Sequence, residues 1–271
     1  MDLSIIIVSY NAVADLERCL ASLRAHPVRA SHEIIVVDNA STDGSAETAE
    51  RVSGVRVVRN RQNLGFSAGN NVGIRASQGD ALLLLNSDTV VPAGALDGLL
   101  ACLDAHPDVA VVGPRLVDGT GRAELSFGPM LSPLTERRQG RLVRDLAAGV
   151  PSVVAHVEAL TRREGRPDWV TGACLLVRRA DAEAVGLLDE RFFMYTEDVD
   201  FCASIRARGR AVLFTPDIEV VHLRGRSAAA APAATRAAYI RSHLAFYEKH
   251  HPWLAPLLRL FRRATRAGRD A

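Results

Sequence analysis

Short apolar stretches alternate with amphipathic stretches throughout the first half of the chain. The apolar stretches are rich in Ile, Val and Leu, have the length of buried strands, and lie at 3–8, 33–37, 55–58, 81–85 and 109–112. Between them, helix-like periodicity covers residues near 12–25, 45–51, 67–77 and 93–105. Repeated strand–helix units with strands that are apolar throughout are typical of a mostly parallel sheet with helices on both faces. The pattern therefore predicts a doubly wound α/β fold.

The pattern changes in the second half of the chain. Residues 118–168 contain several Gly and Pro residues and show little periodicity until about Leu142. They predict a mobile segment that either shapes a substrate site or is an ordinary surface insertion. After it, the sequence predicts a strand at Trp169–Val177, a helix near 197–208, strands near 211–214 and 218–222, and two helices beyond residue 234.

Composition adds limits to this picture. With 271 residues and 48% hydrophobic content, the chain can form one large domain, or one domain with an appendage. Its 33 Lys and Arg residues nearly balance 31 Asp and Glu residues, so no general affinity for polyanions is expected. Four scattered cysteines without a CxxC pair indicate reduced thiols in a cytoplasmic protein. The N-terminus lacks the basic region of a signal peptide, and its apolar stretch is too short to span a bilayer.

The most informative junction lies where Leu82–Leu85 runs into Asn86-Ser87-Asp88. In open α/β sheets, ligands bind beyond the carboxyl ends of the strands. A carboxylate at such an edge suits Mg²⁺ or Mn²⁺, which take oxygen ligands and share them with the phosphates of a substrate. The alternative is a turn in which the Asn and Asp side chains only cap the following helix.

Two further strand ends carry polar side chains. Ser9-Tyr10-Asn11 directly follows the first strand, and Asp38 begins the loop after the second. Asp38 can accept hydrogen bonds from a base N–H or a ribose hydroxyl, and its alternative role is to cap the next turn. Neither G-x-G-x-x-G nor G-x-x-x-x-G-K-[ST] follows the first strand, which argues against a dinucleotide-binding protein and a P-loop protein.

An Asn- and Gly-rich segment from Arg59 to Gly73 follows the third strand. It predicts a loop folded against something polar that leads into a helix N-terminus, where backbone N–H groups favour anionic phosphate. Gly69 and Gly73 lie inside the expected helix, where each glycine costs roughly 1 kcal/mol relative to alanine. Close packing of the helix on the sheet explains these two glycines equally well.

A second group of acidic residues, Glu197, Asp198 and Asp200, follows Thr196, which has the features of a helix N-cap. The helix dipole alone explains acidic residues in a first helical turn. However, the apolar run Phe192–Tyr195 precedes them. Burial in such surroundings raises the pKa of a carboxyl group and suits it to act as a general base.

His222 lies at the end of an apolar stretch, Val220-Val221. A lone histidine in such a position is more often structural than a metal ligand. Beside a metal-binding aspartate it becomes a candidate for a further ligand.

Taken together and in this order, these motifs resemble the family-2 glycosyltransferases of the GT-A fold. The resemblance covers about residues 3–227 and includes Trp169-Val170-Thr171-Gly172-Ala173. Asn70-Asn71-x-Gly73, Glu197-Asp198-x-Asp200 and Tyr247-Glu248-Lys249-His250 are similar to those of bacterial rhamnosyltransferases that build cell-surface polysaccharide. One departure is Asn86, which stands where the family's metal motif, commonly Asp-x-Asp, has its first acid.

The resemblance implies both a fold and an activity. The fold is of GT-A type, a single doubly wound, mixed, mostly parallel sheet flanked by helices, with C-terminal helices. The activity is that of a metal-dependent, inverting hexosyltransferase that moves a sugar, expected to be rhamnose, from a dTDP- or UDP-sugar to a saccharide or lipid-linked acceptor. Residues 1–230 would form the transferase domain, with 118–168 as its mobile acceptor-side segment, and 231–271 a C-terminal helical extension.

The resemblance also implies a role for each matching residue. Asp198 would deprotonate the acceptor hydroxyl, while Asp88 and His222 would hold Mg²⁺ or Mn²⁺ on the donor diphosphate. The residues expected to bind the donor are Ser9, Tyr10, Asn11, Asp38, Arg59, Asn63, Gly65, Asn70, Asn86 and Ser87. Those expected on the acceptor side are Trp169, Thr171, Gly172 and Glu197.

Three other classes of protein fit parts of the pattern. A sugar nucleotidyltransferase shares the sheet and the metal carboxylate, but it should carry a Gly-rich, basic phosphate loop after the first strand, which Ser9-Tyr10-Asn11 does not supply. A non-catalytic nucleotide-sugar-binding module does not need two carboxylate clusters and a histidine. A dehydrogenase is disfavoured because the glycine fingerprint is missing.

The C-terminal stretch 253–269 combines apolar and arginine faces. Such a helix can lie in an anionic membrane surface, which suits a lipid-linked acceptor and a peripheral place on the inner face of the plasma membrane. The alternative is a helix packed on the domain or on a second copy in a homodimer. No nucleic acid partner is expected.

Overall fold

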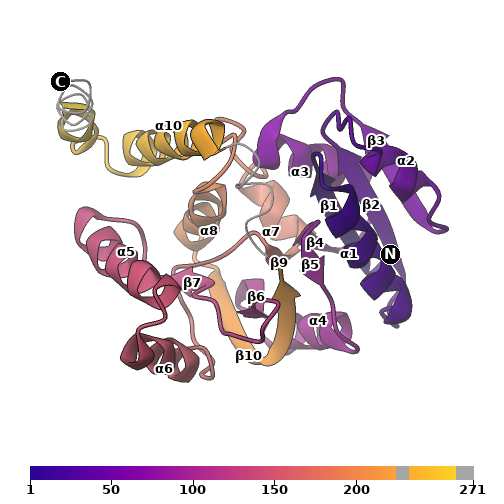
Figure 1. Cartoon of the computed structure of the whole chain (residues 1–271), viewed down its shortest axis with the longest axis horizontal. Helices are drawn as coiled ribbons and strands as arrows, with labels where there is room; N and C mark the ends of the chain where they lie inside the picture. Colours follow the sequence, from indigo (N-terminus) through magenta and orange to yellow (C-terminus); the bar gives the residue numbers. More distant parts are fainter. Residues whose placement is uncertain (224–231, 261–271) are drawn as a thin grey trace.

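The computed structural model describes residues 1–223 and 232–260, and within these residues its largest feature is a sheet of eight strands (Figure 1). Their order across the sheet is β3-β2-β1-β4-β9-β6-β10-β5. The strands are β1 (Leu3–Ser9), β2 (His32–Asp38), β3 (Val55–Arg59), β4 (Ala81–Asn86), β5 (Thr89–Val90), β6 (Val109–Val117), β9 (Cys174–Arg178) and β10 (Ala211–His222). β9 runs antiparallel to β4 and β6, β5 runs antiparallel to β10, and the other neighbours are parallel. The prediction of one mixed, mostly parallel sheet is confirmed.

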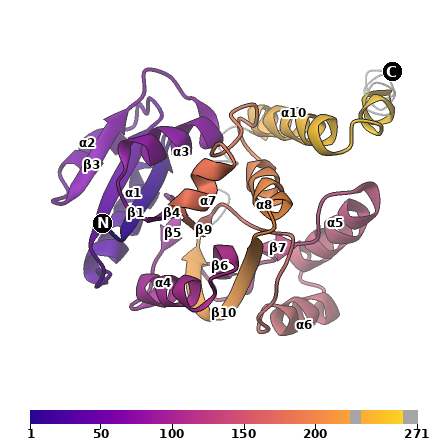
Figure 2. The same cartoon turned by 180° about the vertical axis from the view of Figure 1, so that it is seen from behind.

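Helices connect these strands and cover the sheet. They are α1 (Val13–Ala25), α2 (Ser45–Glu50), α3 (Gly65–Ala76), α4 (Ala95–Ala105), α5 (Pro133–Ala147), α6 (Pro151–Leu160), α7 (Arg179–Ala184), α8 (Glu197–Ala207) and α10 (Pro232–His250). Opposite views show α1 to α3 with β1 to β3 on one side of the molecule, and α5, α6 and α10 on the other (Figures 1 and 2).

The four consecutive leucines of β4 are explained by burial of the strand on both faces of the sheet. Leu83 and Leu85 join the core on one face of the sheet, while Leu82 and Leu84 join the core on the opposite face. All four are buried. Because successive side chains of a strand point to opposite faces, a strand covered on both sides needs apolar residues at every position.

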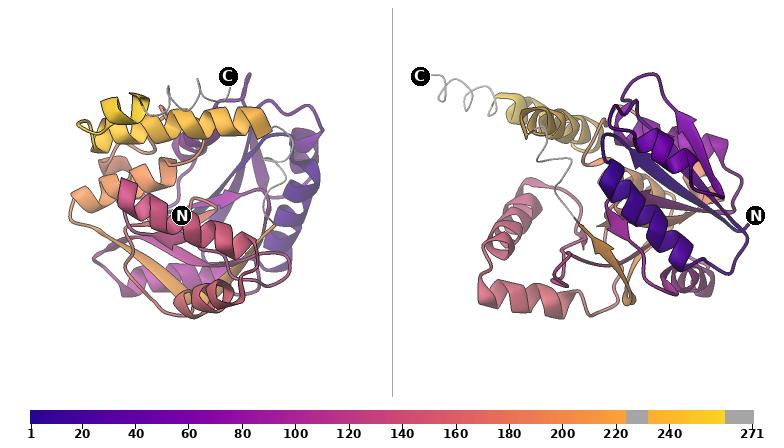
Figure 3. Two further views of the ribbon diagram at one scale, coloured as in Figure 1. Left: turned by 60° about the vertical axis from the view of Figure 1, so that its left-hand side comes forward. Right: turned by 45° about the vertical axis from the view of Figure 1, so that its right-hand side comes forward.

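Residues 118–168 contain regular structure that the sequence did not predict. α5 and α6 form a helical hairpin that stands away from the main sheet (Figure 3). α5 begins with a capping box, in which the Thr135 N–H donates to Ser132 Oγ at 3.3 Å and the Ser132 N–H donates to Thr135 Oγ1 at 2.9 Å. The mobility of this segment and its role on the acceptor side stay predictions.

The roots of this hairpin are held together by a second, small sheet. Here β7 (Phe127–Gly128) pairs antiparallel with β8 (Trp169–Val170). The strand expected at Trp169–Val177 is thus two strands, β8 and β9, with a short connection at 171–173 between them. By contrast, the strands expected at 211–214 and 218–222 are one strand, β10, with a shift in register between Thr215 and Glu219.

α10 packs on α8 through a small core of its own, which includes Phe192, Val199, Phe246 and Tyr247. Beyond α10, a second helical stretch covers 255–260, as the sequence predicted. The rest of the basic stretch 253–269 and the expected domain boundary at residue 230 lie outside the described residues. Among the helices of the described chain, none has the length and apolarity needed to cross a bilayer.

Candidate active site

The pairing of the strands brings the polar strand ends into line at one edge of the sheet. Ser9 at the end of β1 lies opposite Asp38 at the end of β2, and Asp38 lies opposite Arg59 at the end of β3. On the other side of β1, Val8 lies opposite Asn86 at the end of β4. The predicted donor-binding positions of four strands therefore share one edge.

The loops after β1 and β2 are locked together. The Thr42 N–H donates to Asn11 Oδ1 at 2.8 Å, and the Asn11 N–H donates to Ser41 Oγ at 3.0 Å. Asn11 adopts a left-handed conformation with φ of 49°, which Asn tolerates better than most residues. Tyr10, next to it, keeps 46% of its surface exposed. The ring is thus free to contact a ligand at this edge.

Asp38, at the end of β2, is buried at this edge of the sheet. Its Oδ2 accepts a hydrogen bond from the Ser41 N–H at 3.1 Å, so it does cap the next turn. Its Oδ1 and the hydroxyl of Ser9 have no hydrogen-bond partner among the described residues. Buried polar atoms usually have partners, so these two atoms are well suited to bind a polar ligand.

The Arg59 side chain is engaged by acidic residues of a neighbouring helix. Its guanidinium forms hydrogen-bonded ion pairs with Glu47 and Glu50 of α2, each at 2.9 Å. In this structure the guanidinium is already paired with two glutamates of the same chain, so a contact between Arg59 and a donor stays a prediction.

The Asn-rich segment is a tightly folded loop that begins α3. Gly65 has φ of 83°, and a Cβ at this position would lie 2.3 Å from the carbonyl oxygen of Phe193, so glycine is required here. The Gly65 N–H donates to Asn63 Oδ1 at 2.9 Å. Asn70 is buried and its amide donates to the Phe66 carbonyl, one turn back in the same helix, at 2.9 Å.

Gly69 and Gly73 serve close packing of α3 on the sheet. A Cβ at Gly73 would lie 2.5 Å from Ile6 Cγ2, and a Cβ at Gly69 would lie 2.9 Å from Val8 Cγ1. The packing explanation for these glycines is therefore confirmed. The sequence did not single out Asn39, which is buried and donates to the Gly65 carbonyl at 2.9 Å while accepting from Asn60 at 2.8 Å.

Asp88 and His222 lie together, as predicted. Asp88 Oδ1 is 3.2 Å from His222 Nε2, and the Asn86 amide nitrogen is 3.4 Å from the same atom. The antiparallel pairing of β5 with β10 sets Thr89 opposite His222, and the Leu223 N–H donates to the Asp88 carbonyl at 2.8 Å. A strand pair thus holds these two residues, which are far apart in sequence.

Glu124, which the sequence did not single out, orients this histidine. Its Oε2 is 3.2 Å from His222 Nδ1. Burial alone would lower the pKa of His222, but its hydrogen bonds to Asp88 and Glu124 outweigh that effect and raise the pKa to about 9. A carboxylate on one ring nitrogen fixes the imidazole so that the other nitrogen can bind a metal ion.

These residues fit a metal ion that is shared with a substrate. Within the described chain, no three His, Cys, Asp or Glu residues are arranged to hold a metal by themselves. Asp88 and His222 supply one oxygen and one nitrogen, which suit Mn²⁺ and leave the other coordination positions for phosphate oxygens.

The connection at 171–173 links the strand end that carries Asn86-Ser87-Asp88 to Asp198. The Gly172 N–H donates to Asp198 Oδ2 at 3.0 Å, and the carbonyl of Ala173 accepts from the Asn86 N–H at 2.9 Å. Asp198 and the Asn86-Ser87-Asp88 edge are therefore bound to two consecutive residues. The two acidic clusters are thus tied to the same short connection, and their action on one bond of a substrate stays a prediction.

Two opposing effects act on the Asp198 carboxyl group, because burial opposes its ionisation and backbone N–H groups favour its carboxylate form. Burial raises the pKa of Asp198, and hydrogen bonds from the Gly172 and Val199 N–H groups and from the Thr171 side chain lower it, with a net rise. Burial, with the charge of Asp198 second, raises the pKa of Glu197 well above its ordinary value. Two adjacent carboxyl groups thus differ in environment, which is common where one of them is a general base.

The start of α8 is conformationally unusual. Tyr195 and Thr196 both have positive φ, 71° and 64°, although neither is glycine. Thr196 occupies the N-cap position, but its side chain makes no capping hydrogen bond. The predicted cap is therefore correct in position and wrong in mechanism.

Asp200, which the sequence placed in the acidic cluster, serves a different purpose. It is buried, and it binds Lys249 Nζ at 2.9 Å and His250 Nε2 at 2.6 Å. These two residues belong to the end of α10, so Asp200 attaches α10 to α8. Trp169 of β8, which the sequence predicted on the acceptor side, donates from its indole N–H to the Pro129 carbonyl at 2.9 Å.

Comparison with known proteins agrees with this geometry. A family model described as "Glycosyl transferase family 2" matches residues 4–164. The N-acetylglucosaminyl-diphospho-decaprenol L-rhamnosyltransferase of Mycobacterium tuberculosis is 31% identical over 269 residues, covering 94% of this chain and 87% of that protein.

Solved structures share the fold at lower sequence identity. The mannosyltransferase PcManGT from Pyrobaculum calidifontis, in complex with GDP-Man and Mn²⁺, is 19% identical and superposes with a TM-score of 0.62 over 95% of this chain and 68% of that chain. GalNAc-T7 with UDP, GalNAc and Mn²⁺ is 18% identical, with a TM-score of 0.60 over 82% of this chain. This chain spans less than half of GalNAc-T7, 44%.

Proposed function

The chain belongs to glycosyltransferase family 2, and we propose that it transfers rhamnose from a nucleotide-diphosphate sugar to a lipid-linked saccharide during the synthesis of a cell-surface polysaccharide. The name of the mycobacterial relative supports both the sugar and the acceptor class. Inversion of the anomeric centre and dependence on a divalent metal are parts of the same proposal.

The observation that carries this proposal is the short connection between the two acidic clusters. Gly172 binds Asp198, and the next residue, Ala173, binds the backbone of Asn86. One stretch of backbone would thus hold both a base for the acceptor and a metal site for the donor diphosphate. A protein that only binds a nucleotide-sugar has no need of this pairing.

The donor would lie along the sheet edge. The unpaired Oδ1 of Asp38 and the hydroxyl of Ser9 would accept or donate hydrogen bonds to the base and ribose, with Tyr10 against the base. Asn11, Asn63 and Gly65 shape the loops around this position, whereas Asn70 acts through the fold of α3. Asn86 and Ser87 would approach the diphosphate beside Asp88.

The transfer would be a single displacement. Asp198 takes the proton of the acceptor hydroxyl as its oxygen forms a bond to the anomeric carbon, and the bond from that carbon to the diphosphate oxygen breaks with its electron pair. Attack from the face opposite the leaving group inverts the configuration at that carbon. Asp88 and His222 would hold Mg²⁺ or Mn²⁺, which when bound offsets the charge that develops on the nucleoside diphosphate.

The place of the chain in the cell follows from its acceptor. A lipid-linked acceptor puts the enzyme at the cytoplasmic face of the plasma membrane, as a peripheral protein. Exposed apolar side chains at Trp253 and Leu257, at the end of the described chain, support contact of the C-terminal stretch with a membrane or with a second copy. We keep the division into a 1–230 transferase domain and a 231–271 extension as part of the proposal.

The proposal is tested with a panel of nucleotide-sugars, each assayed for release of nucleoside diphosphate with Mn²⁺ and with a chelator. We expect dTDP-rhamnose to give the highest rate and the chelator to abolish it. Equal rates for every sugar would refute rhamnose, and no release from any donor would refute the transferase proposal.

A further inference from the structure

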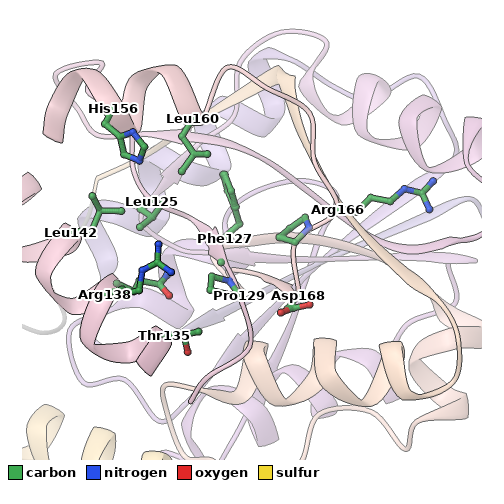
Figure 4. Close-up of a pocket in the computed structure, with 13 residues that line it drawn as sticks. Leu125, Phe127, Pro129, Thr135, Arg138, Leu142, His156, Leu160, Arg166 and Asp168 are labelled. Atoms are coloured by element: carbon green, nitrogen blue, oxygen red, sulfur yellow. The ribbon is translucent and has the colours of Figure 1, made fainter. Parts of the chain in front are cut away.

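A cavity of about 600 Å³ lies between the α5–α6 hairpin and the small sheet (Figure 4). Its lining residues lie between residues 125 and 168 in the sequence, and none of them belongs to the donor edge. Its volume is typical of small-molecule sites, which span roughly 300–1,000 Å³. The lining residues on which the inference depends are Leu125, Phe127, Arg138, Leu142, His156 and Leu160.

The cavity walls are mainly apolar. Figure 4 shows Leu142 of α5, Leu160 of α6 and Phe127 of β7 around the same space, while the Arg166 side chain is directed away from it. The Arg166 side chain pairs with Asp108 instead. Protein interiors rarely leave apolar walls apart at this scale, since each wall loses its packing contacts. The shape therefore indicates an apolar occupant.

Helix α5, which forms one wall of the cavity, also supports an apolar occupant. α5 is 15 residues long, yet none of its residues is buried. A helix with apolar residues normally buries them against its own domain. In α5, Leu142 is only half-buried where it lines the cavity, so an occupant would complete its burial.

The charges of α5 indicate which polar group the apolar occupant of the cavity carries. α5 carries Arg137, Arg138, Arg141 and Arg144, all exposed, against Glu136 and Asp145. Glu136 is engaged by His243 and by the Tyr247 hydroxyl, the latter at 2.6 Å. Arg138 itself lines the cavity, where its guanidinium suits a phosphate oxygen.

The cavity lies next to the acceptor side of the candidate active site. A Cβ at Gly128, a lining residue, would lie 3.0 Å from Trp169 Cζ2. Trp169 belongs to β8, and three residues further along, Gly172 binds Asp198. One wall of the cavity therefore continues directly into the backbone that holds the candidate base.

We propose that this cavity binds the isoprenoid chain of a prenyl-diphosphate-linked acceptor, with Arg138 at its diphosphate. The inference rests on the proposed function, because it names where the lipid of that acceptor is held. Binding of the chain beside β8 would bring the acceptor saccharide toward Asp198 without any contact to the donor edge.

Geranylgeranyl diphosphate is a suitable probe, and Trp169 is a built-in reporter. The chain has two tryptophans, so Trp253→Phe leaves emission from Trp169 alone. In this background we expect saturable quenching by geranylgeranyl diphosphate at least tenfold tighter than by inorganic diphosphate. Equal affinity for the two probes, or no saturable change, would overturn the inference.

Matched variants on α5 locate the site. Leu142→Gln alters a lining residue and Val143→Gln alters its exposed neighbour, so only the first should weaken binding, by about fivefold or more. Arg138→Gln should weaken binding of geranylgeranyl diphosphate but not of geranylgeraniol, and Arg137→Gln should do neither. Equal effects within each pair would refute the assignment to this cavity.

Two further arms separate the alternatives. Phosphatidylglycerol vesicles that displace the probe would show a phospholipid site and would refute the prenyl assignment. Release of nucleoside diphosphate from the donor by the unsubstituted protein reports on the proposed function separately. Donor cleavage without prenyl binding rejects only this inference, whereas prenyl binding without donor cleavage rejects the proposed function on which it rests.

Discussion

The backbone N–H of Gly172 donates a hydrogen bond to Asp198 Oδ2 at 3.0 Å, and this contact joins the helix that carries Asp198 to the sheet edge that carries Asp88. There is little space for a larger residue at this point, because a Cβ on Gly172 would lie 3.1 Å from Phe66 Cε1 and 3.6 Å from Asp198 Cβ. α3, α8 and the end of β4 thus meet around three residues, 171–173.

Replacement of Asp198 by Asn tests its role as the base. The amide keeps the size of the side chain and can still accept from the Gly172 N–H, but it cannot take a proton at neutral pH. We expect transfer to fall by about 10²–10⁴-fold, the usual contribution of a general base, while donor affinity from calorimetry changes little. Asp104→Asn, an exposed position on α4, is the control. Normal turnover in Asp198→Asn would exclude the assignment.

The pH dependence of transfer tests the same carboxylate. Because burial raises the pKa of Asp198, activity should fall as the pH drops through a value above the ordinary Asp value of about 3.9. Thr171→Val removes a hydrogen bond that favours the carboxylate, so the acid limb should move to higher pH by roughly half a unit to one unit. Circular dichroism over the same pH range checks that the protein stays folded. An unmoved or downward-shifted limb would contradict this prediction.

Metal affinity tests Asp88 and His222 without any measurement of turnover. Electron paramagnetic resonance reports free Mn²⁺, which should decrease when the protein and UDP are added together. We expect Asp88→Ala and His222→Ala each to weaken this binding at least tenfold, because each removes one of two protein ligands. Glu124→Gln should weaken it less, since it acts through His222 Nδ1. Unchanged Mn²⁺ binding in Asp88→Ala would falsify the metal site.

Two glycine substitutions separate backbone strain from ordinary helix propensity. Gly65→Ala should destabilise the protein by at least about 1–2 kcal/mol, because L-residues disfavour positive φ and its Cβ would collide with the Phe193 carbonyl. Gly140→Ala in α5 meets no atom within 4 Å and should stabilise the helix by up to about 1 kcal/mol. Urea unfolding measures both. Equal stabilities would show that the loop at Gly65 adapts.

The fold could be predicted from the sequence wherever burial is two-sided. Strands such as β4 need apolar residues at each position, and their ends are marked by sudden polar residues such as Asp38 and Asp88. α5 was missed because the signals that define it are local, a Ser132 cap and Pro133, while its apolar positions are interrupted by arginines. Because α5 buries none of its residues, no long apolar run marks it in the sequence.

The candidate site was predictable in its strand ends and not in its supporting contacts. Glu124 is 98 residues from His222, and Asp200 is 49 residues from Lys249. The spacing of these residues in the sequence does not predict the contacts, because they form only when β10 and α10 pack in the folded protein. The carboxylates of this motif therefore looked alike in sequence, although Asp198 accepts a hydrogen bond from Gly172 and Asp200 binds the end of α10.

The attachment of α10 through Asp200 predicts coupling between the C-terminal helix and catalysis. Asp200 has 2% of its side chain exposed, and it binds both Lys249 and His250 at the end of α10. Asp200→Asn removes the charge, so we expect a loss of about 1–3 kcal/mol in the free energy of unfolding, as for hydrogen bonds to charged groups. Because α8 also carries Asp198, the turnover number should fall more than donor affinity.

Asp189→Asn is the matched control for this coupling. Asp189 binds the same Lys249 Nζ at 2.9 Å, but it is more exposed and lies outside α8. Loss of Asp189 should therefore lower stability less and leave the turnover number near that of the unsubstituted protein. Thermal melts and transfer kinetics on both variants decide the question. Identical behaviour of the two variants would mean that α10 is held by its apolar contacts with Phe192 and Val199 alone, and that its charges do not position the candidate base.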